Sequence, residues 1–345
     1  MYTITGMLLR VGDLSMATIK DVAKIAGVSS AMVSRYLNDG YVSAEKRPLI
    51  AAAIEECGYR PSQQARNLRR GRSKLVGVVV PRINSESVAR ITAGIEQGLS
   101  AAGYQMLLAN TDNDPAQELD YLDLFAAYPT DGLILVGTTV DKAHKDFFDR
   151  CPVPVVVVGQ RYQGVSCVLQ DDFGAARSLA AQLAAARPHA RFAYLAVDPQ
   201  DEAVGVSRPH GFIEGLAEWG ATLDPTCIKQ CEFSSESGLA AARQLLDEAE
   251  AAKTNIDYIC CSTDLIAAGA LRAVGERGLH QGKSPVTVTG FGDNRVVAML
   301  TGGIPTVHFA YRTSGQKSAE MLIEQVEHPD VPPTSSIMGY RVVGL

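Results

Sequence analysis

Long apolar runs, paired cysteines and catalytic motifs are all missing from this chain of 345 residues. No apolar stretch approaches the roughly 20 residues that a helix needs to cross a bilayer, so we expect no membrane span. The seven cysteines include no CxxC pair and no interleaved histidine at a spacing that suits zinc. Cys260 and Cys261 lie in an apolar run, which predicts small core residues. We therefore expect no metal and no other cofactor.

The sequence motifs of common enzyme classes are absent as well. There is no GxSxG, no P-loop, no HExxH and no GxGxxG after a strand. The six histidines are scattered, and the sequence assigns none of them a nucleophile as partner. The motifs therefore favour no class of enzyme.

The first 15 residues lack the basic n-region and the long apolar core of a signal peptide. Met16 directly precedes the first helical pattern of the chain. We expect residues 1–16 to form a disordered leader, translation to start naturally at Met16, and the protein to be cytoplasmic.

The charge of the chain is divided unevenly along its length. Residues 17–74 contain 11 Lys and Arg against 5 Asp and Glu, a net charge of +6, whereas residues 75–345 contain 20 against 32, a net charge of -12. A basic head on an acidic body predicts a polyanionic partner for the head alone.

Residues 18–38 carry two short helical patterns that meet at a turn. Thr18 and Asp21 form a Thr/Asp variant of the capping box, which starts the first helix. Gly27 gives the turn backbone freedom, and Ser29 is placed to cap the second helix. Each helix has one apolar side at helical spacing, formed by Ile19, Val22, Ala23 and Ala26 in the first and by Val33 and Leu37 in the second. The spacing is typical of a helix-turn-helix.

The other side of the second helix is small and polar enough to enter a DNA major groove. It carries Ser30, Ala31, Ser34 and Arg35. Taken alone, the first 40 residues favour an ordinary helical hairpin over a helix-turn-helix. The basic charge of the head and the segments that follow favour DNA binding.

A third helix is expected after the loop at residues 39–42, capped by Ser43 and ended by Gly58, so that residues 17–61 form one helical domain. Residues 62–74 follow as a basic connector that contains no acidic residue. A flexible linker is one interpretation. Ala65 and Leu68 lie three positions apart among good helix formers, so a short hinge helix that forms with a partner is the other.

From residue 75 the pattern changes to short β runs separated by helical stretches. The runs are LVGVVVP, YQMLLAN, DGLILVG, VPVVVVGQ, RFAYLAV, IDYICCS and PVTVTGF. Alternating strands and helices predict parallel sheets, and 271 residues exceed one typical domain. We expect two α/β lobes, an N-lobe of about 75–170 plus 306–328 and a C-lobe of about 171–305 plus 329–345. Ligands bind such sheets at the carboxyl ends of the strands.

These motifs in this order resemble the lactose-repressor (LacI) family of bacterial transcription regulators. The resemblance rests on TIKDVAKIAGVSSAMVSRYLN, GYRPSQQARNLRRGRS, SRPHGF, STDLIAAGALRA, TGFGDN and TVHFAYRTSG, and it covers residues 18–345. It implies a multidomain protein with an all-α helix-turn-helix headpiece, a hinge helix and an α/β core similar to periplasmic sugar-binding proteins. It also implies a homodimer, or a tetramer of two dimers.

The resemblance implies DNA contacts by residues of the headpiece and the hinge. Ser30 and Ala31 match the operator-discriminating pair, and Arg35 matches a shared base or backbone contact. Leu68 matches the leucine that wedges into the central minor-groove step, and Ala65 lets two hinge helices approach closely. The full set is Thr18, Ser29, Ser30, Ala31, Ser34, Arg35, Asn38, Ala65, Leu68 and Arg69.

The resemblance also implies an effector cleft. Arg208 matches an arginine that grips ligand oxygens, with a surface salt bridge as the alternative. Asp264 either caps a helix or faces the cleft. Phe309 and Tyr311 each either stack on a sugar or belong to the core. Of Asp171 and Asp172, one is expected to bind ligand and the other to cap a helix. The set is Ser85, Gln160, Asp172, Arg208, Thr263, Asp264, Asp293 and Phe309.

Two departures from the family pattern concern the sugar contacts. Gly292 stands where many members have an acid, which here follows as Asp293, and Gln160 stands where an acid-arginine pair is common. The chain is most similar to the sucrose and trehalose operon regulators of Gram-positive bacteria. We therefore expect a repressor of a carbohydrate operon that binds palindromic double-stranded DNA and is controlled by a disaccharide or its phosphate. A sugar-binding receptor and an α/β enzyme acting on a sugar are the alternatives.

Overall fold

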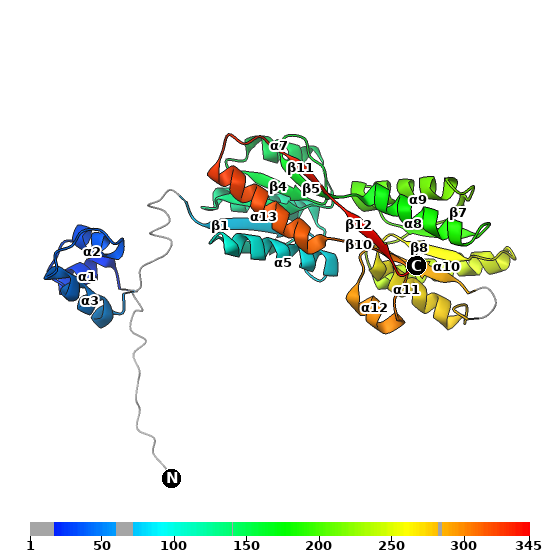
Figure 1. Cartoon of the computed structure of the whole chain (residues 1–345), viewed down its shortest axis with the longest axis horizontal. Coiled ribbons are helices and arrows are strands. Elements are labelled where there is room, and N and C mark those ends of the chain that lie inside the picture. Colours follow the sequence, from blue (N-terminus) through cyan, green and yellow to red (C-terminus); the bar gives the residue numbers. More distant parts are fainter. Residues whose placement is uncertain (1–16, 60–71, 140, 282–284) are drawn as a thin grey trace, which may run out of the picture. The chain divides into compact units, whose positions relative to one another are not determined.

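The computed structural model describes residues 17–59, 72–139, 141–281 and 285–345, so the predicted leader and the hinge residues Ala65, Leu68 and Arg69 lie outside the described residues. The chain divides into two compact units, residues 1–73 and 74–345. We call the first unit the headpiece and the second the core (Figure 1).

The headpiece contains three helices, α1 (Ile19–Ile25), α2 (Ser30–Leu37) and α3 (Lys46–Cys57). The carboxylate of Asp21 accepts hydrogen bonds from the backbone N and the Oγ1 of Thr18, at 2.8 and 2.7 Å, which fixes the start of α1. Ser29 Oγ accepts from Met32 N at 3.2 Å and caps α2. The turn between the helices contains Gly27 at φ +60°. The structure confirms the helix-turn-helix.

The predicted cap at Ser43 is wrong. Helix α3 begins at Lys46 after a turn at Ala44 and Glu45, and its N-cap makes no side-chain hydrogen bond. The backbone oxygen of Ser43 accepts from Lys46 N and Arg47 N instead. The predicted end of this helix is confirmed, because Gly58 closes it at φ +63°.

The N-lobe of the core is built on a six-stranded parallel sheet. Its order is β11 (Ser335–Met338), β5 (Ser166–Gln170), β4 (Val155–Val158), β3 (Gly132–Val136), β1 (Leu75–Val80) and β2 (Gln105–Asn110). One face packs under α5 (Glu86–Ala101) and α13 (Tyr311–Glu327). The other face packs under α6 (Pro115–Ala127) and α7 (Lys142–Arg150).

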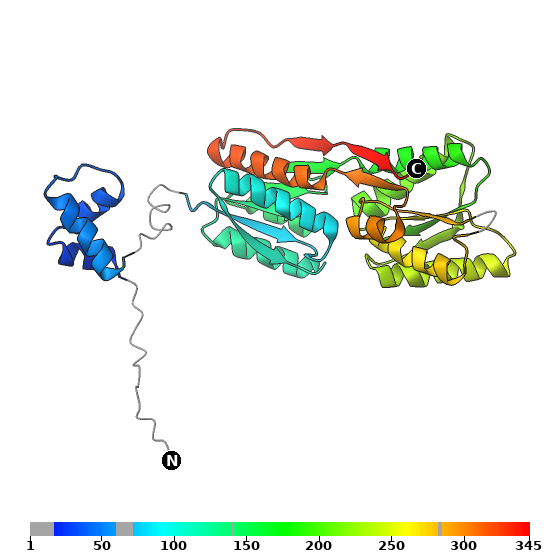
Figure 2. The same ribbon diagram turned by 60° about the horizontal axis from the view of Figure 1, so that its bottom comes forward.

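Helices α5 and α13 lie side by side on the N-lobe, as both views show (Figures 1 and 2). Their backbones approach so closely that a Cβ at Gly94 would lie 2.0 Å from Arg312 O, and one at Gly315 would lie 2.0 Å from Ile91 O. Any larger residue at Gly94 or Gly315 would force the two helices apart.

The C-lobe has a four-stranded parallel sheet in the order β7 (Leu223–Gln230), β6 (Phe192–Ala196), β8 (Tyr258–Cys261) and β9 (Thr287–Thr289). Its faces are covered by α8 (Asp172–Ala186) and α9 (Arg208–Ala217) on one side and by α10 (Ser235–Ala251) and α11 (Asp264–Glu276) on the other. A π-helix, η1 (Glu202–Ser207), leads into α9. Cys260 and Cys261 are fully buried, as the sequence predicted.

The chain passes between the lobes at three places. One connection runs from β5 into α8, one from β10 (Thr306–Phe309) into α13, and one from β11 into β12 (Tyr340–Val343). Strands β10 and β12 form a two-stranded antiparallel ribbon that Figure 1 shows between the two sheets. Helix α12 (Arg295–Thr301) precedes β10 at the edge of the C-lobe.

Residues 335–338, which the sequence placed in the C-lobe, belong to the N-lobe sheet. Strand β11 pairs in parallel with β5, from Ser335 opposite Cys167 to Met338 opposite Gln170. The segment is short and half-exposed, so its composition does not carry the apolar run that identifies the inner strands. Within the described residues, no helix has the length and apolar character needed to cross a membrane.

Candidate functional site

A cavity of about 1010 Å³ lies between the two lobes of the core, and we call it the interlobe cavity. On the N-lobe side it is lined by residues that follow β1, β3 and β4 and by the first turn of α5. On the C-lobe side it is lined by the starts of α9, α11 and α12. The cavity thus lies at the carboxyl ends of parallel strands, as the sequence predicted.

Arg208 is the central charged group of the cavity wall and is 4% exposed. Its Nε donates to Asp172 Oδ1 at 2.8 Å, and its Nη1 donates to the backbone oxygen of Ser262 at 2.6 Å. The guanidinium carbon lies 5.0 and 5.2 Å from the ring centres of Phe291 and Phe309. Arg208 is therefore a buried, oriented cation, and the surface salt bridge is excluded.

The buried pair of Arg208 and Asp172 has perturbed protonation equilibria. Burial raises the pKa of Asp172 to about 6, although the charge of Arg208 opposes this shift. Burial also acts to lower the pKa of Arg208, but the charge and hydrogen bond of Asp172 outweigh it and raise that pKa above its ordinary value. The guanidinium therefore stays charged. As the pH falls, the carboxylate of Asp172 is the group of the pair that takes up a proton.

The neighbouring Asp171 caps a helix, as expected for one of the two acids. Asp171 Oδ1 accepts from Gly174 N at 2.9 Å at the start of α8. Asp172 turns to Arg208 and lines the cavity.

Asp264 lies in the cavity wall with both carboxylate oxygens engaged. Oδ1 accepts from Thr306 Oγ1 and Oδ2 accepts from Asn294 N, each at 2.6 Å. A Cβ at Gly290 would lie 2.2 Å from Asp264 Oδ1, so glycine is needed there. The cap of α11 is Thr263, whose Oγ1 accepts from Ile266 N at 3.3 Å. Asp264 thus ties β10 and α12 to α11 at the cavity wall.

Gln160 makes a direct contact between the lobes. Its Nε2 donates to Thr138 O in the N-lobe at 3.0 Å and to Asp201 Oδ1 in the C-lobe at 2.9 Å. Asp201 also accepts from Val204 N at 3.0 Å and caps η1. Burial raises the pKa of Asp201. Ser85, the N-cap of α5, also lines the cavity, with its Oγ 3.0 Å from Ser87 Oγ.

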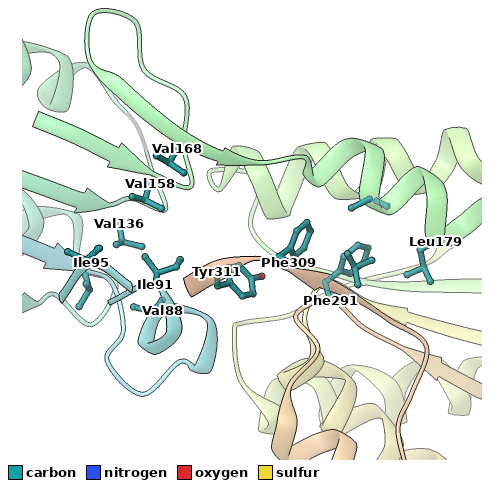
Figure 3. Packing of buried hydrophobic residues seen from close by; sticks show 14 of the residues in the cluster. Val88, Ile91, Ile95, Val136, Val158, Val168, Leu179, Phe291, Phe309 and Tyr311 are labelled. Carbon is teal, nitrogen blue, oxygen red and sulfur yellow. The ribbon is translucent and has the colours of Figure 1, made fainter. Parts of the chain in front are cut away.

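Six of the eight predicted effector residues line the interlobe cavity, and two do not. Asp293 Oδ2 lies 2.7 Å from His308 Nδ1 instead. Phe309 is fully buried in the cluster that Figure 3 shows between the lobes, and it belongs to the core. Tyr311 is in the same cluster and also lines the cavity (Figure 3).

Among the cavity residues that the sequence did not predict are Arg82, Gln170, Asp201 and Phe233. Arg82 and Gln170 each stand at or just after the carboxyl end of a strand that the sheet buries. Polar residues in that position are the signal that could have identified them. Asp201 and Phe233 stand in loops without a pattern that marks them.

The headpiece presents a polar surface on α2. Ala31, Arg35 and Asn38 are exposed, Ser30 and Ser34 are half-buried, and Val33 on the opposite side is fully buried. Thr18 and Ser29, the residues that start α1 and α2, are also exposed. Asn38 Nδ2 donates to Ser34 O at 2.7 Å, so its side chain folds back on the last turn of the helix.

Two family models match the chain. "Bacterial regulatory proteins, lacI family" matches residues 18–62, and "Periplasmic binding proteins and sugar binding domain of LacI family" matches residues 73–338. A sucrose operon repressor of Staphylococcus xylosus is 29% identical over 91% of this chain and 95% of its own. The HTH-type transcriptional repressor PurR of Pectobacterium atrosepticum is 30% identical over 90% of this chain and 91% of its own.

Solved structures are similar over nearly the whole chain. A transcriptional regulator, CelR, in complex with cellobiose has a TM-score of 0.71 and 28% identity, and the match covers 95% of this chain and 98% of that one. The Lac repressor dimer bound to operator and the anti-inducer ONPF has a TM-score of 0.83 at 23% identity, with 96% and 98% covered. The second likeness concerns the fold alone.

Proposed function

The chain belongs to the LacI family of bacterial regulatory proteins, and on this premise we propose that it represses a carbohydrate operon under the control of a disaccharide. Membership makes it a DNA-binding transcriptional repressor with a sugar-binding type of core, and a regulator rather than an enzyme. Beyond family membership, we propose the class of operator, the class of effector and the residues that contact each.

We propose that the headpiece reads DNA through the exposed side of α2. Ser30 and Ala31 offer a hydroxyl and a methyl group, and Arg35 offers the one long donor on that side. Because the two short residues carry little discrimination, DNA shape supplies part of the sequence preference. The supporting residues of this interface are Thr18, Ser29, Ser34 and Asn38, together with Ala65, Leu68 and Arg69 of the hinge.

The observation that carries the effector proposal is the interlobe cavity around Arg208 and Asp172. Its volume of about 1010 Å³ is at the upper end of ligand sites, which suits two sugar rings better than one. Two relatives support the class, since one is a sucrose operon repressor and another was solved with cellobiose. PurR relatives of similar identity make other ligands the competing proposal.

A neutral disaccharide fits the cavity charges better than its phosphate. The charged residues of the wall are Arg82, Arg208 and Arg295 against Glu86, Asp172, Asp201 and Asp264. Asp172 pairs with Arg208 and Glu86 pairs with Arg295, both at 2.8 Å, so these guanidinium groups are already neutralised. A phosphate dianion would therefore meet more negative than positive charge.

The two functions are coupled if the sugar binds one arrangement of the lobes better than the other. Groups from both lobes line the cavity, and Gln160 and Asp201 already meet across it. Sugar binding would change the relative position of the lobes, and the dimer would pass this change to the paired hinges. Because the core carries the cavity and the headpiece the DNA surface, this coupling requires both units.

A mobility-shift assay tests the proposal. The full chain is titrated onto palindromes found upstream of its own gene and of neighbouring sugar genes, at low and at physiological salt, against scrambled DNA of equal length. Sucrose, trehalose, cellobiose, their phosphates, glucose and fructose are then added in turn. We expect a specific shift that a disaccharide alters. A chain that retards no palindrome at low salt, or that responds to none of the sugars, would contradict the operator or the effector part respectively.

A further inference from the structure

Two residues that line the interlobe cavity each carry a buried polar atom without a hydrogen-bond partner in the protein. In the part of the chain that the structure describes, six buried side-chain nitrogen and oxygen atoms lack such a partner. Two of the six belong to cavity residues, the Nε of Arg82 and the Oε1 of Gln170. A buried polar atom without a partner is costly, so a ligand that satisfies it gains affinity.

The guanidinium of Arg82 is held in place from the opposite lobe. Arg82 follows β1 in the N-lobe, and its Nη1 donates to Phe233 O in the C-lobe at 3.0 Å. Its guanidinium carbon lies 4.3 Å from the centre of the Phe233 ring. Unlike Arg208 and Arg295, it has no carboxylate within ion-pair distance among the described residues. Nε is therefore a fixed donor with no bond to make within the protein.

The orientation of the Gln170 amide follows from its neighbour. Ser314 Oγ donates to Ala310 O at 3.0 Å, so it accepts from the amide nitrogen of Gln170 at 2.7 Å. Nε2 is thereby assigned to Ser314, and Oε1 is left as the free acceptor. The cavity wall of the N-lobe thus offers one unpaired donor and one unpaired acceptor.

We propose that Arg82 and Gln170 bind hydroxyl groups of the effector, Arg82 as a donor that also bridges the lobes and Gln170 as an acceptor. The inference rests on the proposed sugar effector and deepens it. A hydroxyl both donates and accepts, so sugar hydroxyls satisfy both atoms, whereas an ionised phosphate group only accepts and cannot itself pair with Gln170 Oε1. Because Arg82 already contacts Phe233, a sugar held by Nε binds best when the lobes are together.

The chain offers a matched control for each residue. Arg90 is also an N-lobe arginine that bridges to the C-lobe, since its Nη1 donates to Gly292 O at 3.2 Å and its guanidinium lies 5.6 Å from the Tyr311 ring centre, but it does not line the cavity. Gln325 Oε1 is likewise buried without a partner, and it also lies away from the cavity. A variant of Arg90 shows the effect of losing a contact between the lobes alone, and a variant of Gln325 shows the effect of losing a buried amide alone. A larger effect at Arg82 or Gln170 therefore reports a lost ligand contact.

Calorimetric titration of the full chain with sucrose, trehalose, cellobiose and the 6-phosphates of sucrose and trehalose tests the inference. Wild type is compared with Arg82→Met, Arg82→Lys, Gln170→Met, Arg90→Met and Gln325→Met, each first shown to be folded by circular dichroism. For the tightest sugar, we expect Arg82→Met and Gln170→Met each to weaken affinity about 10- to 100-fold. The two controls should change it by less than about threefold.

Arg82→Lys tests the geometry of the donor. Lysine keeps the charge but lacks the planar group that contacts Phe233. We therefore expect Arg82→Lys to weaken sugar affinity nearly as much as Arg82→Met does. Equal losses in Arg82→Met and Arg90→Met, with Gln170→Met like wild type, would overturn the inference and leave the proposed function standing. Tightest binding by a phosphate, unaffected by Gln170→Met, would overturn the hydroxyl assignment. A wild type that binds no sugar would overturn both this inference and the proposed effector.

Discussion

Arg35 is the long basic side chain on the exposed side of α2, and its nearest neighbours there are short. Serine and alanine side chains cannot replace the contact that an arginine makes with a base. We expect Arg35→Ala to weaken binding to the operator by about 1–3 kcal/mol and to relax its sequence preference. Quantitative mobility shifts on the operator and on single-base variants measure both effects. If affinity falls equally on every sequence, Arg35 contacts phosphate only.

Arg208 holds the buried carboxylate of Asp172 in an ion pair. Without Arg208, Asp172, which is 6% exposed, would lose its one ion-pair partner among the described residues. Breaking a buried pair in this way costs about 3–5 kcal/mol, whereas an exposed pair is worth about 1 kcal/mol or less. We expect Arg208→Met to lower the free energy of unfolding of the core by about 3–5 kcal/mol. Arg243→Met, which breaks the exposed pair with Glu276, should lower it by about 1 kcal/mol or less.

Urea denaturation of the core measures both variants of this comparison. The double variant Arg208→Met with Asp172→Asn should recover part of the lost free energy, because it removes the unpaired charge. Equal, small losses for Arg208→Met and Arg243→Met would mean that the Arg208 pair is accessible to water.

Helices α6 and α7 of the N-lobe are joined by one fully buried histidine. His144 Nε2 lies 2.7 Å from Glu118 Oε1 and Nδ1 lies 2.8 Å from Asp141 Oδ1. Burial acts to lower the pKa of His144, but the hydrogen bonds and charges of the two carboxylates outweigh it and raise the pKa above its ordinary value. The folded protein therefore binds this proton more tightly than the unfolded chain.

The stability from His144 is present below the pKa of the unfolded chain, about 6.5, and is lost as pH rises through the higher folded pKa. We expect the free energy of unfolding of the core to fall as the pH rises above about 6.5, and His144→Gln to flatten that fall. Urea denaturation at several pH values checks this. An unchanged slope in the variant would exclude His144 as its source.

The elements that the sequence predicted well are those whose signal is local. Ser29, Gly27 and Gly58 act within one turn, and the inner strands β1, β3 and β4 are continuous apolar runs because they are buried on both faces. Strands β7 and β11 lie at sheet edges, are half-exposed and have mixed composition. Their place is decided by pairing with distant strands, and a local pattern does not contain it.

Much of the candidate site followed from the same logic and its resemblance to a known family. Residues that the resemblance marked, such as Arg208 and Gln160, line the cavity. The sequence did not predict their hydrogen-bond partners. Asp172 pairs with Arg208 and Asp201 pairs with Gln160, and each partner comes from an element that is remote in sequence. Asp293 was expected to line the cavity, but its side chain contacts His308 instead.

At the scale of the whole molecule, the headpiece and the core each have a hydrophobic cluster of their own. The headpiece cluster is formed by residues of α1 to α3 and the loop between α2 and α3. We therefore expect two calorimetric transitions in the full chain. A sugar at 100 times its dissociation constant should stabilise only the core transition, by about 2.7 kcal/mol, and operator DNA should stabilise the headpiece transition. A single transition moved equally by both ligands would mean that the two units unfold together.

The long separation in sequence between the first and last strands of the N-lobe has a consequence during protein synthesis. Sheet partners of this lobe extend from Leu75 to Met338, so its sheet is incomplete until residues 335–338 have left the ribosome. The headpiece, complete by residue 59, is made first and has its own core. A premature stop codon late in the gene would therefore leave the DNA-binding unit intact and remove its control, so such alleles should differ in phenotype from deletion of the gene.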